Sequence, residues 1–224
     1  MDVLTFLAEK YGVILSQRKL PIEIPDTDRD TLAHLFGVFG FTRGVELGVE
    51  RGHYAEVLLR ENVALHLSCV DAWRAYPGYR DHVSQEKLDR FYVETSDRLR
   101  PYQQRTTLIR QFSVDAAPQF ADGSLDFVYI DAAHDVASVI ADLSAWARKV
   151  RVGGIVAGHD YIRVKPPSLM HVPQAIHAWT DAYQIAPWFV LGRHEKVAGE
   201  KRDDGRSWFY VQPEPVPRKG RIQQ

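Results

Sequence analysis

The sequence contains little sulfur and no long apolar run. Only one cysteine and two methionines occur among its 224 residues, so no disulfide can form within the chain, and a reducing, cytoplasmic setting is expected. No apolar stretch approaches the roughly 18 residues of a membrane-spanning helix. The N-terminal residues also lack the basic start and apolar core of a signal peptide. We therefore expect a cytoplasmic protein that has no membrane partner.

An excess of charge of either sign is also absent. The 28 lysines and arginines nearly balance 29 aspartates and glutamates, which gives a net charge of -1. Such a chain has no basic field to attract phosphate backbones, which argues against nucleic acid as a partner. The length and the hydrophobic fraction of 45% fit one globular domain. We place this domain at residues 1–212, with cap helices within residues 1–40 and a flexible, proline-bearing tail at 213–224.

Short apolar runs alternate with segments of helical character. In chain order the runs lie at residues 43–48, 65–70, 107–109, 125–130, 154–157, 188–191 and 207–211. Parallel strands need crossover connections, which are usually helices, so this alternation predicts an α/β fold with a mostly parallel sheet covered on both faces. Only a polar stretch with glycine-bearing turns separates the last two runs. They are therefore expected to form an antiparallel hairpin at the sheet edge.

An insertion rich in aromatic residues spans residues 73–101 and is expected to be helical from Val83 to Leu99. Its position suggests that it walls a pocket. The aromatic candidates for lining an acceptor pocket are Trp73, Tyr76, Tyr79, Trp179 and Trp188. Because most aromatic side chains belong to cores, a core position remains the alternative for each of them.

A glycine turn follows the first run of the predicted sheet. Gly48 and Gly52 lie between that run and a helical segment, where absent side chains let a ligand approach the backbone. Asp71 ends the next strand, the position at which a carboxylate accepts the hydroxyls of a ribose. Together these residues indicate an adenosine cofactor. A purely structural turn and a capping aspartate remain the alternatives.

Glu46 distinguishes between two adenosine cofactors. Its carboxylate would repel the pyrophosphate of a dinucleotide but would attract a cationic ligand. S-adenosylmethionine carries an ammonium and a sulfonium and has no phosphate, so the sequence favours it over NAD. The alternatives for Glu46 are an exposed strand position and an ion pair with Arg43.

Four segments carry a resemblance to a known family. They are Val45-Glu-Leu-Gly-Val-Glu-Arg-Gly52, Val70-Asp-Ala-Trp73, Asp126-Phe-Val-Tyr-Ile-Asp-Ala-Ala-His134 and Gly153-Gly-Ile-Val-Ala-Gly-His-Asp-Tyr161. Over roughly residues 40–212 the chain resembles class I S-adenosylmethionine-dependent methyltransferases. Within that superfamily it is similar to the branch that includes the macrolide-sugar O-methyltransferases.

The resemblance implies a Rossmann-like sheet of seven strands in the order 3-2-1-4-5-7-6, with an antiparallel seventh strand. It also implies that Ala72 and Trp73 lie at the cofactor and that Phe112 and Ser113 border its adenine. Glu50 stands where the commoner pattern has glycine. The methionine end of the cofactor is therefore expected to be held differently in this chain.

Asp131 and Asp160 each end a predicted strand. If the two strands are neighbours, about 4.8 Å apart, both carboxylates can bind one divalent cation. Oxygen ligands favour Mg²⁺, whereas participation of His159 or His134 favours Mn²⁺ or another transition metal. The resembling enzymes bind a metal with acidic residues at matching positions, but here His159 replaces the second acid.

A metal-free site stays open as the alternative. Asp131 would then orient His134 or approach the cofactor's ammonium, and Asp160 would bind the acceptor. In either case His134 is the first candidate for the base, because imidazole titrates near neutral pH. Packing against the cofactor is its alternative role. Asp135 precedes a helical run and is expected to cap it.

The sequence thus favours an O-methyltransferase that acts on a small hydroxylated molecule. Two alternatives are an NAD-dependent oxidoreductase and a non-catalytic, cofactor-binding member of the fold. The residues do not identify the acceptor, and they leave homo-oligomer formation open.

Overall fold

The computed structural model describes residues 2–76, 84–165 and 169–214. Its centre is one eight-stranded sheet. The strands are β1 (Ile22–Ile24), β2 (Arg43–Leu47), β3 (His66–Asp71), β4 (Thr106–Arg110), β5 (Leu125–Ile130), β6 (Val150–Gly158), β7 (Trp188–Leu191) and β8 (Trp208–Val211). The helices are α1 (Val3–Tyr11), α2 (Arg29–Val38), α3 (His53–Glu61), α4 (Gln85–Leu99), α5 (Ser113–Ala116), α6 (Val136–Trp146) and α7 (Val172–Ala182).

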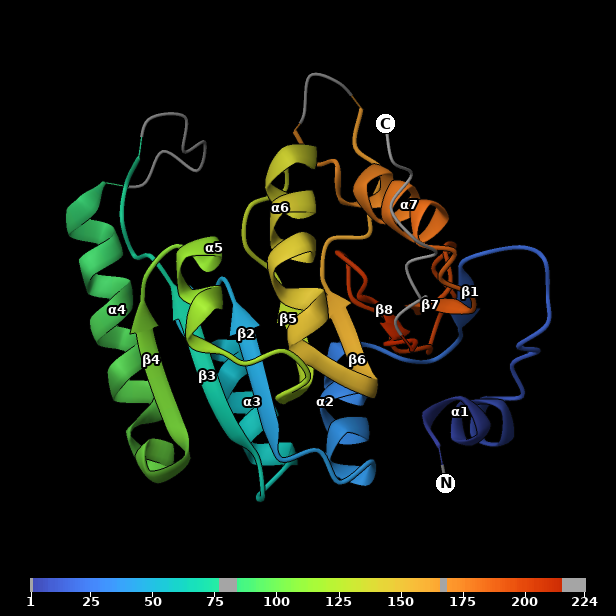
Figure 1. The fold of residues 1–224 in the computed structure, drawn as a ribbon, viewed down its shortest axis with the longest axis horizontal. Coiled ribbons are helices and arrows are strands. Elements are labelled where there is room, and N and C mark those ends of the chain that lie inside the picture. Colours follow the sequence, from blue (N-terminus) through green and yellow to red (C-terminus); the bar gives the residue numbers. More distant parts are fainter. Residues whose placement is uncertain (1, 77–83, 166–168, 215–224) are drawn as a thin grey trace, which may run out of the picture.

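Helices cover both faces of the sheet, with α5 and α6 in front of it and α2 and α3 behind it in Figure 1. Alternation along the strands separates two apolar cores. In β5, Phe127 and Tyr129 face the core shared with α2, α3 and α4, whereas Val128 and Ile130 face the core shared with α6 and α7. The predicted α/β architecture is therefore confirmed.

The strand order is β1-β7-β8-β6-β5-β2-β3-β4. From β4 to β7 it reproduces the order predicted from the resemblance, and β8 runs antiparallel to both of its neighbours. The predicted count of seven strands was one too low, because β1 adds a parallel edge strand beside β7. The antiparallel hairpin is therefore present but does not form the edge. β1 escaped prediction because it has only three residues.

Side-chain N-caps set the starts of two helices, close to the positions that the sequence predicts. The Asp135 side chain accepts hydrogen bonds from the amides of Ala137 and Ser138, which confirms it as the cap of α6. Asp28 and Thr31 form a reciprocal capping box at the start of α2. Helix α4 begins at Gln85, and Val83 lies outside the described residues, as does the predicted tail beyond residue 214. No helix within the described ranges is long and apolar enough to cross a bilayer.

Candidate functional site

The candidate residues gather at the carboxyl ends of β2, β3, β5 and β6. Glu46 lies in β2 and Asp71 ends β3, while Asp131 and Asp160 lie just beyond β5 and β6. The chain order reverses between β2 and β5, since β2 is hydrogen-bonded to β3 on one side and to β5 on the other. Open α/β sheets bind their ligands at such a reversal. The topology therefore supports one site around these four acids.

Gly48 lets two strand ends approach each other. Its backbone has a φ of 82°, and a Cβ atom there would lie 2.0 Å from the carbonyl oxygen of Asp131. The Asp131 amide in turn donates to the Leu47 carbonyl over 2.9 Å. Packing within the chain is thus sufficient to require glycine at this position. Gly52, with a φ of 74°, is the N-cap residue directly before α3.

Replacement of Gly48 by alanine is expected to destabilise the protein by at least about 1–3 kcal/mol, because it combines backbone strain with a clash. Urea unfolding measures this loss. Gly40→Ala is the matched control, since Gly40 has a φ of 68° but nothing within 4 Å of its added Cβ. Equal losses in the two variants would show that the contact with Asp131 is unimportant.

Asp71 organises the glycine turn. Its two carboxylate oxygens accept hydrogen bonds from the amides of Glu50 at 2.9 Å and Trp73 at 2.8 Å. Burial raises the pKa of Asp71, and these amides oppose the shift. Each carboxylate oxygen has a second lone pair, so acceptors for a ribose remain. The adjacent Ala72 is half-buried.

The Trp73 side chain also holds the glycine turn in place. Its residue surface is only 1% exposed, and its indole donates a 2.7 Å hydrogen bond to the Glu50 carbonyl. Its ring packs edge-on against Tyr92. The side chain is thus part of the core and braces the turn, and it does not line an open pocket.

Glu46 is a buried acid with an unsatisfied oxygen. The residue is 2% exposed, and its Oε2 atom has no hydrogen-bond partner among the described residues. Burial raises the pKa of Glu46 well above its ordinary value, the nearby Asp131 charge adds to this, and Arg29 opposes it. A buried acceptor without a donor is costly. The position therefore suits a ligand that brings a donor or a positive charge.

The structure brings Asp131, His134 and Asp160 together. One ligand atom from each lies within 4.8 Å of the others. The His134 Nε2 atom lies 2.8 Å from an oxygen of Asp160 and 4.0 Å from one of Asp131. Asp160 adopts a φ of 57°, which is uncommon for a residue with a side chain. Two carboxylates and one imidazole are a donor set for a divalent cation.

The protonation of His134 follows from these neighbours. The neighbouring carboxylates of Asp131 and Asp160 raise the pKa of His134 to about 10, although burial opposes the shift. Burial alone would raise the pKa of Asp160, but His134 and His159 hold it well below its usual range. His134 therefore carries a proton at neutral pH in this arrangement. It can accept a proton or bind a metal ion only after it has lost that proton.

His159 lies beside this group. Its Nδ1 atom is 3.4 Å from Asp160 and 3.9 Å from Asp131, and its Nε2 atom has no hydrogen-bond partner within the described part of the chain. Its ring also packs on Gly205, where an added Cβ would lie 2.4 Å from Cε1. The group of converging ligand atoms therefore consists of Asp131, His134 and Asp160, and His159 lies beside it.

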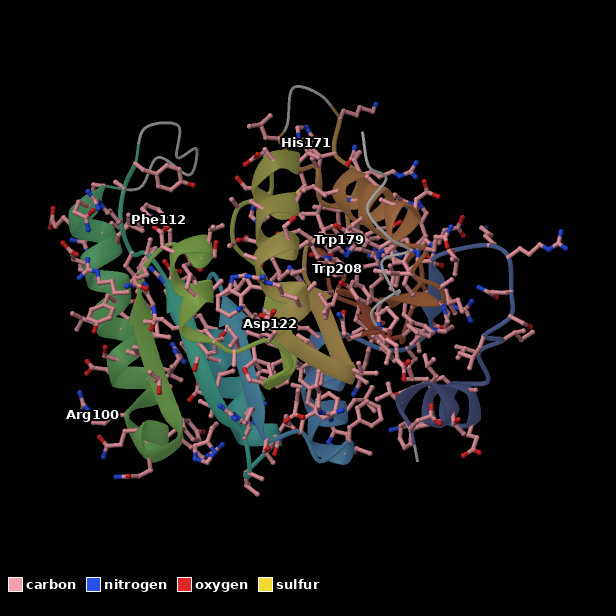
Figure 2. The ribbon with its side chains drawn as sticks, in the orientation of Figure 1. Arg100, Phe112, Asp122, His171, Trp179 and Trp208 are labelled. Atoms are coloured by element: carbon pink, nitrogen blue, oxygen red, sulfur yellow. The ribbon has the colours of Figure 1, made fainter. Side chains whose placement is uncertain are left out.

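Phe112 and Ser113 lie at the start of α5, as Figure 2 shows for Phe112 near the end of β4. Phe112 is 37% exposed and meets the ring of Tyr76 edge-on. The Ser113 hydroxyl donates to Asp142, and its carbonyl accepts from the Trp146 indole at 3.0 Å. Helix α6 thus fixes Ser113.

The remaining aromatic candidates divide between core and surface. Trp179 and Trp188 are buried, and the Trp179 indole donates to the Tyr210 hydroxyl over 3.1 Å. Trp179 projects from α7 and Trp208 lies in β8, and both side chains, labelled in Figure 2, belong to the same apolar core. Tyr76 is 39% exposed, and Tyr79 lies outside the described residues.

Sequence reasoning missed Arg29 and Asp203. The Arg29 amide donates to Asp203 over 2.7 Å, across 174 positions in the sequence. The Asp203 charge in turn acts on Arg29, and that of His159 acts on Asp203. No motif or spacing links two segments so far apart, so only the fold reveals that they border the site.

A family model described as a methyltransferase domain matches residues 45–161. Sequence comparison with curated proteins finds no match. Among solved structures, a putative caffeoyl-CoA O-methyltransferase from Staphylococcus aureus is 14% identical at a TM-score of 0.58, covering 93% of this chain and 90% of its own. A putative O-methyltransferase from Klebsiella pneumoniae is 18% identical at 0.58, with 91% and 86% covered.

An O-methyltransferase from Bacillus cereus, solved in complex with SAH, is 17% identical at a TM-score of 0.57, covering 81% of this chain and 79% of its own. At these identities the likeness concerns the fold. The family match covers more than half of the 224 residues and includes every strand end of the candidate site. The resemblance to class I methyltransferases is thereby confirmed, and the chain belongs to this methyltransferase-domain family.

Proposed function

We propose that the chain binds S-adenosylmethionine and methylates an oxygen of a small hydroxylated molecule. The observation that carries the proposal is Glu46, a buried carboxylate with one oxygen lacking a donor at the strand reversal. It suits the cofactor's ammonium and disfavours a pyrophosphate. When bound, S-adenosylmethionine supplies a methyl group activated by its sulfonium.

The surrounding residues fit the other parts of this cofactor. Asp71 retains lone pairs for the ribose hydroxyls, while its contacts with Glu50 and Trp73 hold the turn in place. Phe112 offers an exposed ring, and Ser113 is fixed beside it, as an adenine border requires. The chain's main contribution to the reaction is then to position the acceptor oxygen in line with the methyl group.

We further propose that Asp131, His134 and Asp160 hold a divalent cation, with His159 beside it. The mixture of oxygen and nitrogen donors favours Mn²⁺ over Mg²⁺. A cation there would lower the pKa of a bound acceptor hydroxyl. In the metal-free alternative, Asp131 and Asp160 hold His134 in place next to the acceptor.

The chain's composition supports a small molecule as the acceptor, because a net charge of -1 provides no general attraction to nucleic acid. The single cysteine, Cys69, is buried and free, which agrees with a cytoplasmic location. Self-association remains a prediction that sedimentation analysis would test.

Calorimetric titration with S-adenosylhomocysteine and with NAD tests the cofactor proposal. We expect binding of S-adenosylhomocysteine and none of NAD. The reverse result would replace the proposal by the oxidoreductase alternative. Binding of S-adenosylhomocysteine without its formation from S-adenosylmethionine, over a broad panel of hydroxylated acceptors, would favour the non-catalytic alternative.

Replacement of Asp71 by alanine is expected to weaken S-adenosylhomocysteine binding by about ten- to a hundredfold, because it removes a charge-assisted hydrogen bond. Calorimetry measures the change, and thermal unfolding checks that the turn persists. Asp97→Ala, at an exposed carboxylate on α4, should leave the affinity unchanged. Unaltered affinity in a folded Asp71→Ala protein would show that the ribose lies elsewhere.

A further inference from the structure

Three backbone amides of the glycine turn are already engaged. The Gly48 amide donates to Val70 and the Gly52 amide to Val49, while the Glu50 amide donates to Asp71. These donors are therefore not free to bind a carboxylate. If an amino-acid ligand lies above this turn, groups other than these three amides must donate to its carboxylate.

Arg29 is held next to this turn by contacts from two distant segments. Its amide donates to Asp203 over 2.7 Å, and its carbonyl accepts from the Tyr54 hydroxyl over 2.9 Å. It is also the first residue of α2, directly after the capping residue Asp28. The position of its backbone is thus well determined.

A row of neighbouring residues connects the Arg29 side chain to Glu46 through two tyrosine rings. The Arg29 guanidinium carbon lies 5.3 Å from the centre of the Tyr54 ring, whose own centre is 4.4 Å from that of Tyr129. Tyr129 is the register partner of Glu46 across β2 and β5, so both face the same side of the sheet. The Arg29 charge also opposes the upward shift in the pKa of Glu46.

Neither charged group of this row forms an ion pair within the part of the chain that the structure describes. Within the described residues, no carboxylate lies within the 4.0 Å of an ion pair with the Arg29 guanidinium, and Oε2 of Glu46 has no donor. A half-buried cation therefore lies near a buried anion. A free amino acid is a ligand class that carries both a carboxylate for such a cation and an ammonium for such an anion.

We propose that Arg29 binds the carboxylate of the cofactor's methionine part, while Glu46 binds its ammonium. The inference rests on the proposed function. The planar guanidinium can donate two parallel hydrogen bonds to a carboxylate. This arrangement explains how the chain tolerates Glu50 in a turn whose Gly48, Glu50 and Gly52 amides are already used. Arg29 is then a binding residue contributed by the N-terminal helices.

The test compares two probes in calorimetric titrations: S-adenosylhomocysteine and its decarboxylated analogue, which keeps the ammonium. Arg29→Gln should weaken S-adenosylhomocysteine binding by about ten- to a hundredfold, because a charge-assisted contact is lost. The same variant should bind the decarboxylated analogue as the unaltered protein does. Arg29→Lys should bind S-adenosylhomocysteine more tightly than Arg29→Gln but less tightly than the unaltered protein. Lysine keeps the positive charge but lacks the planar guanidinium that donates two parallel hydrogen bonds.

Arg60→Gln is the control, because Arg60 is an exposed arginine on α3, and it should bind both probes normally. Thermal unfolding of every variant separates a local effect from loss of the fold. Unchanged affinity of Arg29→Gln for S-adenosylhomocysteine, or an equal loss for both probes, would overturn the inference alone. If the unaltered protein binds neither probe, the cofactor proposal itself fails and this inference fails with it.

Discussion

Replacement of Asp160 by asparagine will reduce Mn²⁺ affinity by about a hundredfold or more. Loss of a residue that merely supports a metal ligand costs about ten- to a hundredfold, so loss of a ligand itself should cost at least the upper value. Asp160 is one of the three residues whose ligand atoms converge within 4.8 Å. Calorimetry with MnCl₂ and metal analysis of the purified protein measure the effect.

Two comparisons make this result specific. Asp135→Asn, at a nearby carboxylate that caps α6, should keep both the helix and the metal, because asparagine caps as well as aspartate. Asp160→Asn should still bind S-adenosylhomocysteine, since Glu46 and Asp71 lie on other strands. An unaltered protein that contains no metal and takes up no Mn²⁺ would leave the metal-free arrangement around His134 as the explanation.

Replacement of Glu46 by glutamine will weaken S-adenosylhomocysteine binding by about a hundredfold, the upper end expected for a hydrogen bond to a charged group. The glutamine has nearly the same shape but cannot balance an ammonium. The same change should increase the free energy of unfolding by about 1–3 kcal/mol, because a buried, incompletely paired carboxylate is removed. Calorimetry and urea unfolding measure the two opposite effects.

The stability gain should depend on pH. Burial raises the pKa of Glu46 above the ordinary value of 4.5 in the folded state. The folded protein then binds the proton more tightly than the unfolded chain, so its stability falls as pH rises from 4.5 through the folded pKa. Glu46→Gln lacks this ionisation, and its advantage should be small in acid and larger at neutral pH. A variant that is less stable at neutral pH would show that Glu46 has a partner within the fold.

The sequence predicted the sheet because its strand ends carry recognisable residues. Apolar runs that end in Gly48, Asp71, Asp131 and Asp160 mark four parallel strands, and helical segments between them specify the crossovers. β1 was missed because three residues, Ile22 to Ile24, are too few for a periodic pattern. Its strand character comes from pairing with β7.

The sequence could predict only those site residues that lie at or near the end of a strand. Asp131 and Asp160 could be placed side by side from strand adjacency. Which of the two histidines, His134 or His159, lies closer to the Asp131 and Asp160 carboxylates depends on how the chain turns after β5. It also depends on the positive φ of Asp160. Arg29 enters through tertiary contacts with Tyr54 and Asp203, which no local pattern encodes.

The short strand β1 also has a consequence for the behaviour of the protein in concentrated solution. A sheet edge exposes amide and carbonyl groups that can recruit a strand from another molecule. Here that edge is only three residues long, and Pro21 and Pro25 flank it directly. Proline donates no hydrogen bond and limits further strand growth. The β1 edge is thereby protected against aggregation by strand addition, although the aromatic hairpin beside it would otherwise be a strong template.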